Sequence, residues 1–79
     1  MYILRKSGSE CKSHDSMLGK FAILEDCAQA CINKAGCKFF IYGTASKDGY
    51  CYHEFTSTAK CTEGFDKDSY DFYELLGNS

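Results

Sequence analysis

The sequence predicts a small α+β domain in which one helix packs on an antiparallel sheet of about four to five strands. The chain has 79 residues and six cysteines, so disulfides are expected to reinforce a small core. One segment has the periodicity of an amphipathic helix, and those after it have the composition and alternation of strands. This length allows one domain, which we place at 1–79.

Charge and composition exclude two classes of partner. The net charge of −2 gives no basic field for nucleic acid. The apolar runs span only a few residues, too short for membrane insertion. An even number of cysteines without a C-x2-C pair indicates three disulfides formed in an oxidising compartment. We therefore predict a secreted, extracellular or cell-surface protein, and we expect this chain to be excised from a larger one, because no signal peptide precedes it.

The N-terminal quarter predicts one strand and a long loop. Residues 2–4 are apolar and prone to form a strand, and a turn follows. The segment 10–20 is polar and irregular, so it is predicted as a loop. Met17, Leu18 and Phe21 are expected to hold this loop against the core.

The helix is predicted from a stripe of buried positions. Leu24, Cys27, Ala28 and Cys31 follow the i, i+3, i+4, i+7 spacing. Acidic residues in the first turn interact well with the helix dipole. Ile23 stands where a capping serine, threonine or aspartate is usual.

A hairpin is predicted after the helix. The strand 37–42 has two apolar faces, which is typical of a central strand. The loop 43–49 ends in an Asp-Gly turn and leads to a return strand at 50–55. The segment 56–69 is predicted mostly as loop, and 70–76 as the last strand.

The spacing of the cysteines restricts their pairing. Cys27 and Cys31 lie one turn apart on the same helix face, too far for an unstrained bridge to each other. Cys31 is close to Cys37 beyond the helix end, and Cys27 then reaches the return strand. The remaining two cysteines pair by elimination. The predicted bridges are Cys11–Cys61, Cys27–Cys51 and Cys31–Cys37.

The central part of the sequence resembles the PAN/apple family. The resemblance rests on the C-x3-C-x5-C run of the helix, on Phe40 and Tyr42 after it, and on the cysteine of the return strand. It covers about 11–76 and is most specific over 24–55. It implies a helix on a curved antiparallel sheet in a secreted adhesion or recognition module. In apple domains of blood proteases the final cysteine lies near the C-terminus, whereas Cys61 precedes the predicted last strand.

The sequence gives little support to catalysis or metal binding. Ser13, His14 and Asp15 are adjacent in a predicted loop, so their side chains diverge and form no triad. A zinc site built from cysteines and His53 would leave a cysteine unpaired. The aspartates of 66–71 lack the glycine and glutamate of an EF-hand loop. We predict no enzyme activity, no metal site and no cofactor.

The predicted binding surface lies on the hairpin. Six tyrosines and six phenylalanines exceed what so small a core can hide. If Cys51 faces the helix, the side chains at 50, 52 and 54 face away from it. Alternatively, the first and last strands, with Tyr2 and Phe72, cover this outer face. The candidate binding residues are Lys47, Asp48, Tyr50, Tyr52, His53 and Glu54.

These observations favour a recognition module that binds an extracellular protein through the hairpin loop and the outer sheet face. One alternative is a lectin-like domain, in which a small polar pocket with an aromatic floor binds a glycan. Another is a small secreted effector, such as a protease inhibitor that presents the loop 44–49. The oligomeric state is not predicted.

Overall fold

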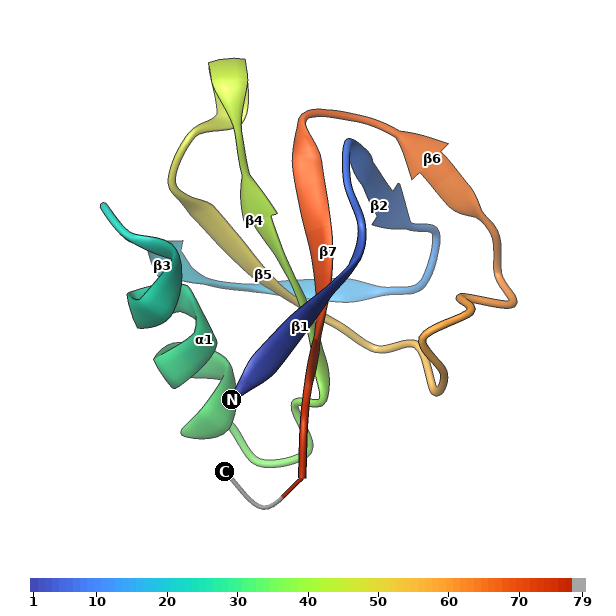
Figure 1. Ribbon diagram of the computed structural model, residues 1–79, viewed down its shortest axis with the longest axis horizontal. Coiled ribbons are helices and arrows are strands. Elements are labelled where there is room, and N and C mark those ends of the chain that lie inside the picture. The colour runs from blue at the N-terminus through green and yellow to red at the C-terminus, as the bar shows by residue number, and fades with distance from the viewer. Residues whose placement is uncertain (78–79) are drawn as a thin grey trace.

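The computed structural model describes residues 1–77 and places one α-helix against a five-stranded antiparallel sheet, with a two-stranded sheet beside it (Figure 1). The elements of this part of the chain are β1 (Tyr2–Lys6), β2 (Ser9–Cys11), β3 (Asp15–Lys20), α1 (Leu24–Ile32), β4 (Phe39–Gly43), the 3-10 turn η1 (Ala45–Lys47), β5 (Tyr50–Glu54), β6 (Phe65–Lys67) and β7 (Tyr70–Leu75). The predicted α+β class and the helix-on-sheet architecture are confirmed.

Strand β4 is the central strand of the larger sheet, whose order is β1-β7-β4-β5-β3. It pairs with β5 on one side and β7 on the other. Phe39, Phe40 and Ile41 are at most 2% exposed, because both faces of the strand are covered. The two apolar faces of this segment therefore predicted its central position correctly.

The helix covers one face of the sheet. Cys27, Ala28 and Cys31 form its buried stripe, as the periodicity predicts, and they pack with Phe40 and Tyr73. The helix begins without a side-chain cap and has acidic residues in its first turn. Its stability therefore depends on burial of this stripe and on the disulfides more than on capping.

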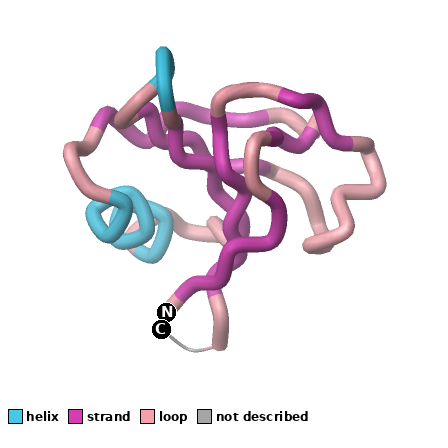
Figure 2. Tube along the Cα trace, turned by 45° about the horizontal axis from the view of Figure 1, so that its top comes forward, coloured by secondary structure: helices cyan, strands magenta, loops and turns pink. Residues whose placement is uncertain are grey.

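The second layer of the fold covers the other face of the sheet. In Figure 2 the helix lies on one side of the strands, and the β2–β6 sheet with its loops lies on the other. Phe39, Ile41, Tyr70 and Phe72 are buried there together with one disulfide. The outer face is therefore largely covered. Phe72 takes part in this as expected, whereas Tyr2 packs edge-on against Phe40 and Tyr73 in the helix-side cluster.

Two loop predictions were wrong in part. The segment 10–20 contains most of β2 and all of β3, and the segment 56–69 contains β6. Strand β3 is an edge strand with mostly exposed side chains, so it lacks the apolar alternation that marks a half-buried strand. Leu18 and Phe21 do pack on the helix-side cluster. Met17 is 49% exposed and does not hold the segment to the core.

Three disulfides connect the layers, and they join the same pairs that the spacing predicts. They are Cys11–Cys61, Cys27–Cys51 and Cys31–Cys37, with Cα–Cα distances of 5.9, 5.6 and 5.3 Å. The second ties the helix to β5, and the first ties β2 to the loop before β6. No free cysteine occurs in residues 1–77.

Candidate functional site

The structure does not bring the six predicted binding residues into one site. Lys47 and Asp48 lie in the turn after β4, and the other four belong to β5. Side chains alternate along a strand, so His53 lies on the helix side while Glu54 lies on the outer side with the two tyrosines. Each group therefore has its own surroundings.

The two tyrosines of β5 are half-buried parts of the outer layer. The ammonium group of Lys20 lies 5.1 Å from the ring centroid of Tyr50. The ring of Tyr52 meets that of Tyr70 edge-on, with centroids 6.0 Å apart. Both rings pack against the outer core cluster, so only part of each ring is open to a partner.

Lys47 is held by an ion pair instead of projecting freely. Its ammonium group donates to both carboxylate oxygens of Asp68, at 2.9 and 2.8 Å. It also lies 5.1 Å from the ring centroid of Tyr70. The hydrogen bond to Asp68 raises the pKa of Lys47. Asp48 is exposed at the tip of the same turn.

A cleft of about 390 Å³ lies where the end of β5 meets the loop after the helix. His53 is the predicted candidate whose side chain lies on this side of the strand. The residues around the cleft are Lys34, Ala35, Gly36, Lys38, His53, Glu54, Phe55 and Thr56. The cleft therefore combines a loop that follows the helix with the end of a strand.

An exposed aromatic ring and two amines characterise this cleft. Phe55 is 51% exposed, and its ring lies 4.1 Å from that of His53, with the planes tilted by 59°. Burial, and to a smaller extent the charge of Lys34, lowers the pKa of His53. The neutral form of His53 is therefore favoured. Within the described chain, neither Lys34 nor Lys38 forms an ion pair, so both amines are available to a ligand.

A second cleft, of about 420 Å³, has different walls. It is lined by Ile32, Cys37, Lys38, Glu74, Leu75, Leu76 and Gly77. It contains no aromatic ring, and its lysine and glutamate have opposite charges. Because it lacks an aromatic ring and contains only Lys38 of the two amines, it is the weaker candidate.

Glu54 is the most buried ionisable residue of the predicted set. It is 1% exposed, and its Oε1 accepts a hydrogen bond of 2.8 Å from the Ser13 hydroxyl. Burial is the main reason that the pKa of Glu54 rises to about 8, with the Ser13 hydrogen bond opposing the shift and the charge of Asp15 adding to it. Glu54 thus faces the outer side as the alternation predicts, and the alternative in which this face is covered applies to it, because β2 and the residues after it cover this position.

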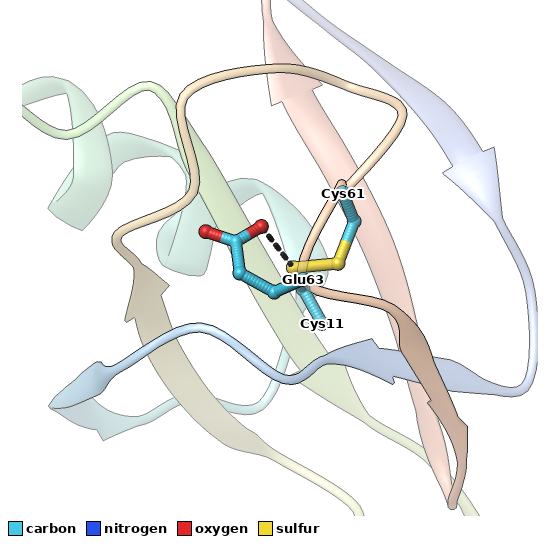
Figure 3. A group of neighbouring side chains, drawn as sticks. All are labelled: Cys11, Cys61 and Glu63. Atoms are coloured by element: carbon cyan, nitrogen blue, oxygen red, sulfur yellow. Dashed lines mark hydrogen bonds between the residues drawn. A yellow bond between two sulfur atoms is a disulfide. The ribbon is translucent and has the colours of Figure 1, made fainter.

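The group formed by Cys11, Cys61 and Glu63 has the composition of a metal site but not its chemistry (Figure 3). Both sulfurs belong to one disulfide, so neither is a thiolate that can bind a metal. Glu63 Oε1 lies 3.7 Å from Cys11 Sγ and accepts a hydrogen bond of 2.7 Å from the Thr56 hydroxyl. Glu63 therefore holds the loop 56–64 against the disulfide.

The helix-on-sheet fold with its three disulfides agrees with the protein family that the sequence matches. The family model described as PAN domain matches residues 3–77. The chain belongs to the PAN domain family. Comparison with curated proteins and with solved structures gives no significant match. PAN domains are protein- or carbohydrate-binding modules that are generally not enzymes, and disulfide-rich members are typical of extracellular proteins. Among residues 1–77 of this PAN domain, no helix is long and apolar enough to span a membrane.

The sequence contained a signal for only part of the cleft of this PAN domain. Phe55 follows His53 by two residues at the end of a predicted strand, so strand alternation places both rings on one side. Lys34 and Lys38 flank Gly36 in the sequence, but no local pattern connects them with β5. Their position beside His53 depends on how the helix packs on the sheet.

Proposed function

We propose that this PAN domain is an extracellular recognition module that binds a carbohydrate in the cleft beside His53 and Phe55. The observation that carries the proposal is the exposed ring of Phe55 in a concave surface flanked by two amines. The outer sheet face, the surface expected to bind a protein, is largely covered by the second layer. The cleft is the better supported surface.

The cleft has groups suited to both faces of a sugar. An aromatic ring packs against the apolar C–H face of a pyranose, and Phe55 offers half of its surface for this contact. Lys34 and Lys38 supply donors for hydroxyl or acidic groups at the rim. A volume of about 390 Å³ lies within the range of about 300–1,000 Å³ that is typical of small-molecule sites.

The proposed role is non-enzymatic. Ser13 donates its hydroxyl to Glu54 at 2.8 Å, which supports a structural role for this serine over that of a nucleophile. The family membership and the three disulfides support a secreted or cell-surface location. The ion pair of Lys47 with Asp68 restrains the loop 44–49, and this gives the protease-inhibitor alternative no support.

A glycan array tests the proposal with three proteins: the oxidised domain, its Phe55→Ala variant and an Ile23→Ala control. Ile23 is 52% exposed, so the control removes a similarly exposed apolar side chain outside the cleft. We expect the wild type and the control to bind the same glycans, and Phe55→Ala to weaken binding at least tenfold. No signal from the oxidised wild type, or equal signals from both variants, would contradict the proposal.

A protein partner is the second candidate, because β1 is an exposed edge of the larger sheet. Ile3 and Leu4 are 39% and 48% exposed, and an apolar edge strand can pair with a strand of another protein. Binding of the labelled domain to cells distinguishes the candidates. Loss of binding after removal of surface glycans supports the cleft, whereas glycan-independent binding that Leu4→Lys abolishes supports β1.

A further inference from the structure

Three carboxylates converge on the outer side of β5, and one of them, Glu54, also lines the cleft. Glu10 comes from β2, Asp15 from the start of β3 and Glu54 from the end of β5. One oxygen from each lies within 4.8 Å of the others. Glu54 is distant in sequence from the other two, and the pairing of β3 with β5 sets Asp15 directly opposite Glu54. The pairing of the strands therefore brings these carboxylates together, and they are not neighbours in a continuous run of acidic residues.

Glu54 carries an unsatisfied oxygen in this cluster. The residue is 1% exposed, and its Oε1 is engaged by Ser13. In the described chain no hydrogen bond of normal geometry reaches Oε2, although this atom is buried. Buried polar atoms are nearly always paired, and an unpaired one is destabilising. The backbone of Cys11 also acts on the Glu54 carboxylate, but it does not satisfy Oε2 with normal geometry. A buried carboxylate with such an oxygen, clustered with two further carboxylates, is an arrangement that a bound cation would satisfy.

No basic side chain of the described chain neutralises the cluster. Lys47 is the cation that acts on Glu10, but both oxygens of Asp68 already bind its ammonium group. Lys12 forms its ion pair with Asp66 instead, at 3.6 Å. When its three carboxyl groups are ionised the cluster therefore has an excess of negative charge, and Asp15, which is exposed, leaves it open to solvent.

We propose that Glu10, Asp15 and Glu54 bind a calcium ion. Calcium takes oxygen ligands at about 2.3–2.6 Å, so two oxygens on opposite sides of the ion lie up to about 5 Å apart. The three oxygens lie within 4.8 Å of one another, which is compatible with this span. Calcium accepts such irregular sets of protein oxygens, whereas magnesium demands near-ideal octahedral geometry. The cluster contains no histidine or thiolate, the ligands that zinc prefers. Water completes the coordination on the side of Asp15.

The expected affinity is that of an extracellular module, with a dissociation constant of about 10⁻⁴–10⁻³ M. Three carboxylates and one open side provide fewer ligands than a complete EF-hand loop. An ion at this position would cross-link β2, β3 and β5, and so connect the small sheet with the larger one. Calcium should therefore stabilise the folded domain.

Isothermal calorimetry and thermal unfolding of the oxidised domain test the site, with calcium chloride as the added ligand after removal of metals by EDTA. We expect one bound calcium ion per chain and a rise of several degrees in Tm at 10 mM calcium. No heat of binding together with an unchanged Tm in the wild type would overturn the proposal.

Two variants identify the ligands. Asp15→Asn changes an exposed residue and should leave the fold intact, while Glu54→Gln keeps the shape of the buried side chain. Both should weaken calcium binding at least tenfold and remove the rise in Tm. Asp26→Asn is the matched control, because Asp26 is an exposed carboxylate on the helix, across the sheet from the cluster. If Asp15→Asn and Asp26→Asn respond equally to calcium, the assignment is wrong. Glu54 also lines the cleft, so Asp15→Asn, which changes a residue outside the cleft, distinguishes the two proposals: it should weaken calcium binding and leave glycan binding unchanged.

Discussion

Glu54 and His53 are consecutive residues of β5, and their side chains lie on opposite sides of the strand. His53 contacts Phe55 in the cleft on the helix side, whereas Glu54 accepts a hydrogen bond from Ser13 on the outer side. The proposed carbohydrate cleft and the proposed calcium site therefore share β5, and Glu54 takes part in both. Because β5 is also tied to the helix by the Cys27–Cys51 disulfide, each site has a rigid support.

The stability of the metal-free domain should fall as the pH rises from about 6.5 to 8. Burial is the main cause that raises the pKa of Glu54 to about 8 and that of Glu10 to about 7, and a hydrogen bond with Asp68 contributes for Glu10. These groups have a pKa near 4.3 when unfolded, so between about pH 4.3 and 8 the folded state binds more protons. Each such group can lower the free energy of unfolding by up to ~1.4 kcal/mol per pH unit.

His53 acts in the opposite direction at lower pH. Burial lowers the pKa of His53 in the folded state, so the unfolded state binds the proton more readily. Protonation below about pH 6.5 therefore lowers the free energy of unfolding, and above this pH His53 has little effect. The decrease due to the carboxyl groups is therefore clearest above pH 6.5. Urea unfolding in EDTA at pH 6.5, 7.0, 7.5 and 8.0 measures it. Glu54→Gln should flatten the decrease, whereas Glu25→Gln, at an exposed helix position, should retain it. A stability that rises over this range would refute the assignment.

The parts of the fold that local patterns encode were predictable from the sequence. The helix stripe at Cys27, Ala28 and Cys31 and the doubly apolar segment that became β4 are examples, because burial on one or both faces leaves a periodic trace. Strands β2 and β3 leave no such trace. They are polar, and long-range backbone hydrogen bonds with β6 and β5 define them.

The candidate sites were predictable only to the level of strand faces. Alternation placed Glu54 and His53 on opposite sides of a strand, but it did not show what covers each side. The partners of Glu54 come from a segment predicted as loop, and those of His53 come from the loop after the helix. Contacts between segments so distant in the sequence have no local signal.

Removal of the three disulfides should destabilise the domain in the order of the loops that they close. The sequence separations are 6, 24 and 50 residues for Cys31–Cys37, Cys27–Cys51 and Cys11–Cys61. Loop-closure entropy predicts losses of about 2, 3.5 and 4 kcal/mol. Double alanine variants of each pair, compared by urea unfolding, check the order. A larger loss for the shortest loop than for the longest would show that native-state packing, not chain entropy, decides the effect.

The Lys47–Asp68 ion pair should stabilise the domain more than the other lysine pair on this side. Lys47 makes two short hydrogen bonds to Asp68 and contacts the ring of Tyr70, whereas Lys12 lies 3.6 Å from an exposed Asp66. We expect Lys47→Met to lower the free energy of unfolding measurably more than Lys12→Met does. Chemical unfolding at low and high salt measures both. Equal losses would indicate that the geometry of the first pair adds nothing.

Gly43 should be the glycine least tolerant of substitution, because the turn after β4 folds back directly onto it. A Cβ added at Gly43 would lie 1.8 Å from the carbonyl oxygen of Lys47, and this backbone atom cannot move without opening the turn. We expect Gly43→Ala to cost about 3 kcal/mol or more. Gly36→Ala is the control: Gly36 has a φ of +80° but open space around its Cβ position, so only backbone strain of about 1–2 kcal/mol is expected. Thermal unfolding of both variants tests the difference. If Gly36→Ala lowers the stability more than Gly43→Ala does, the strain of a positive φ costs more than the close approach of the Lys47 carbonyl. The turn after β4 would then be less tightly packed than this contact implies.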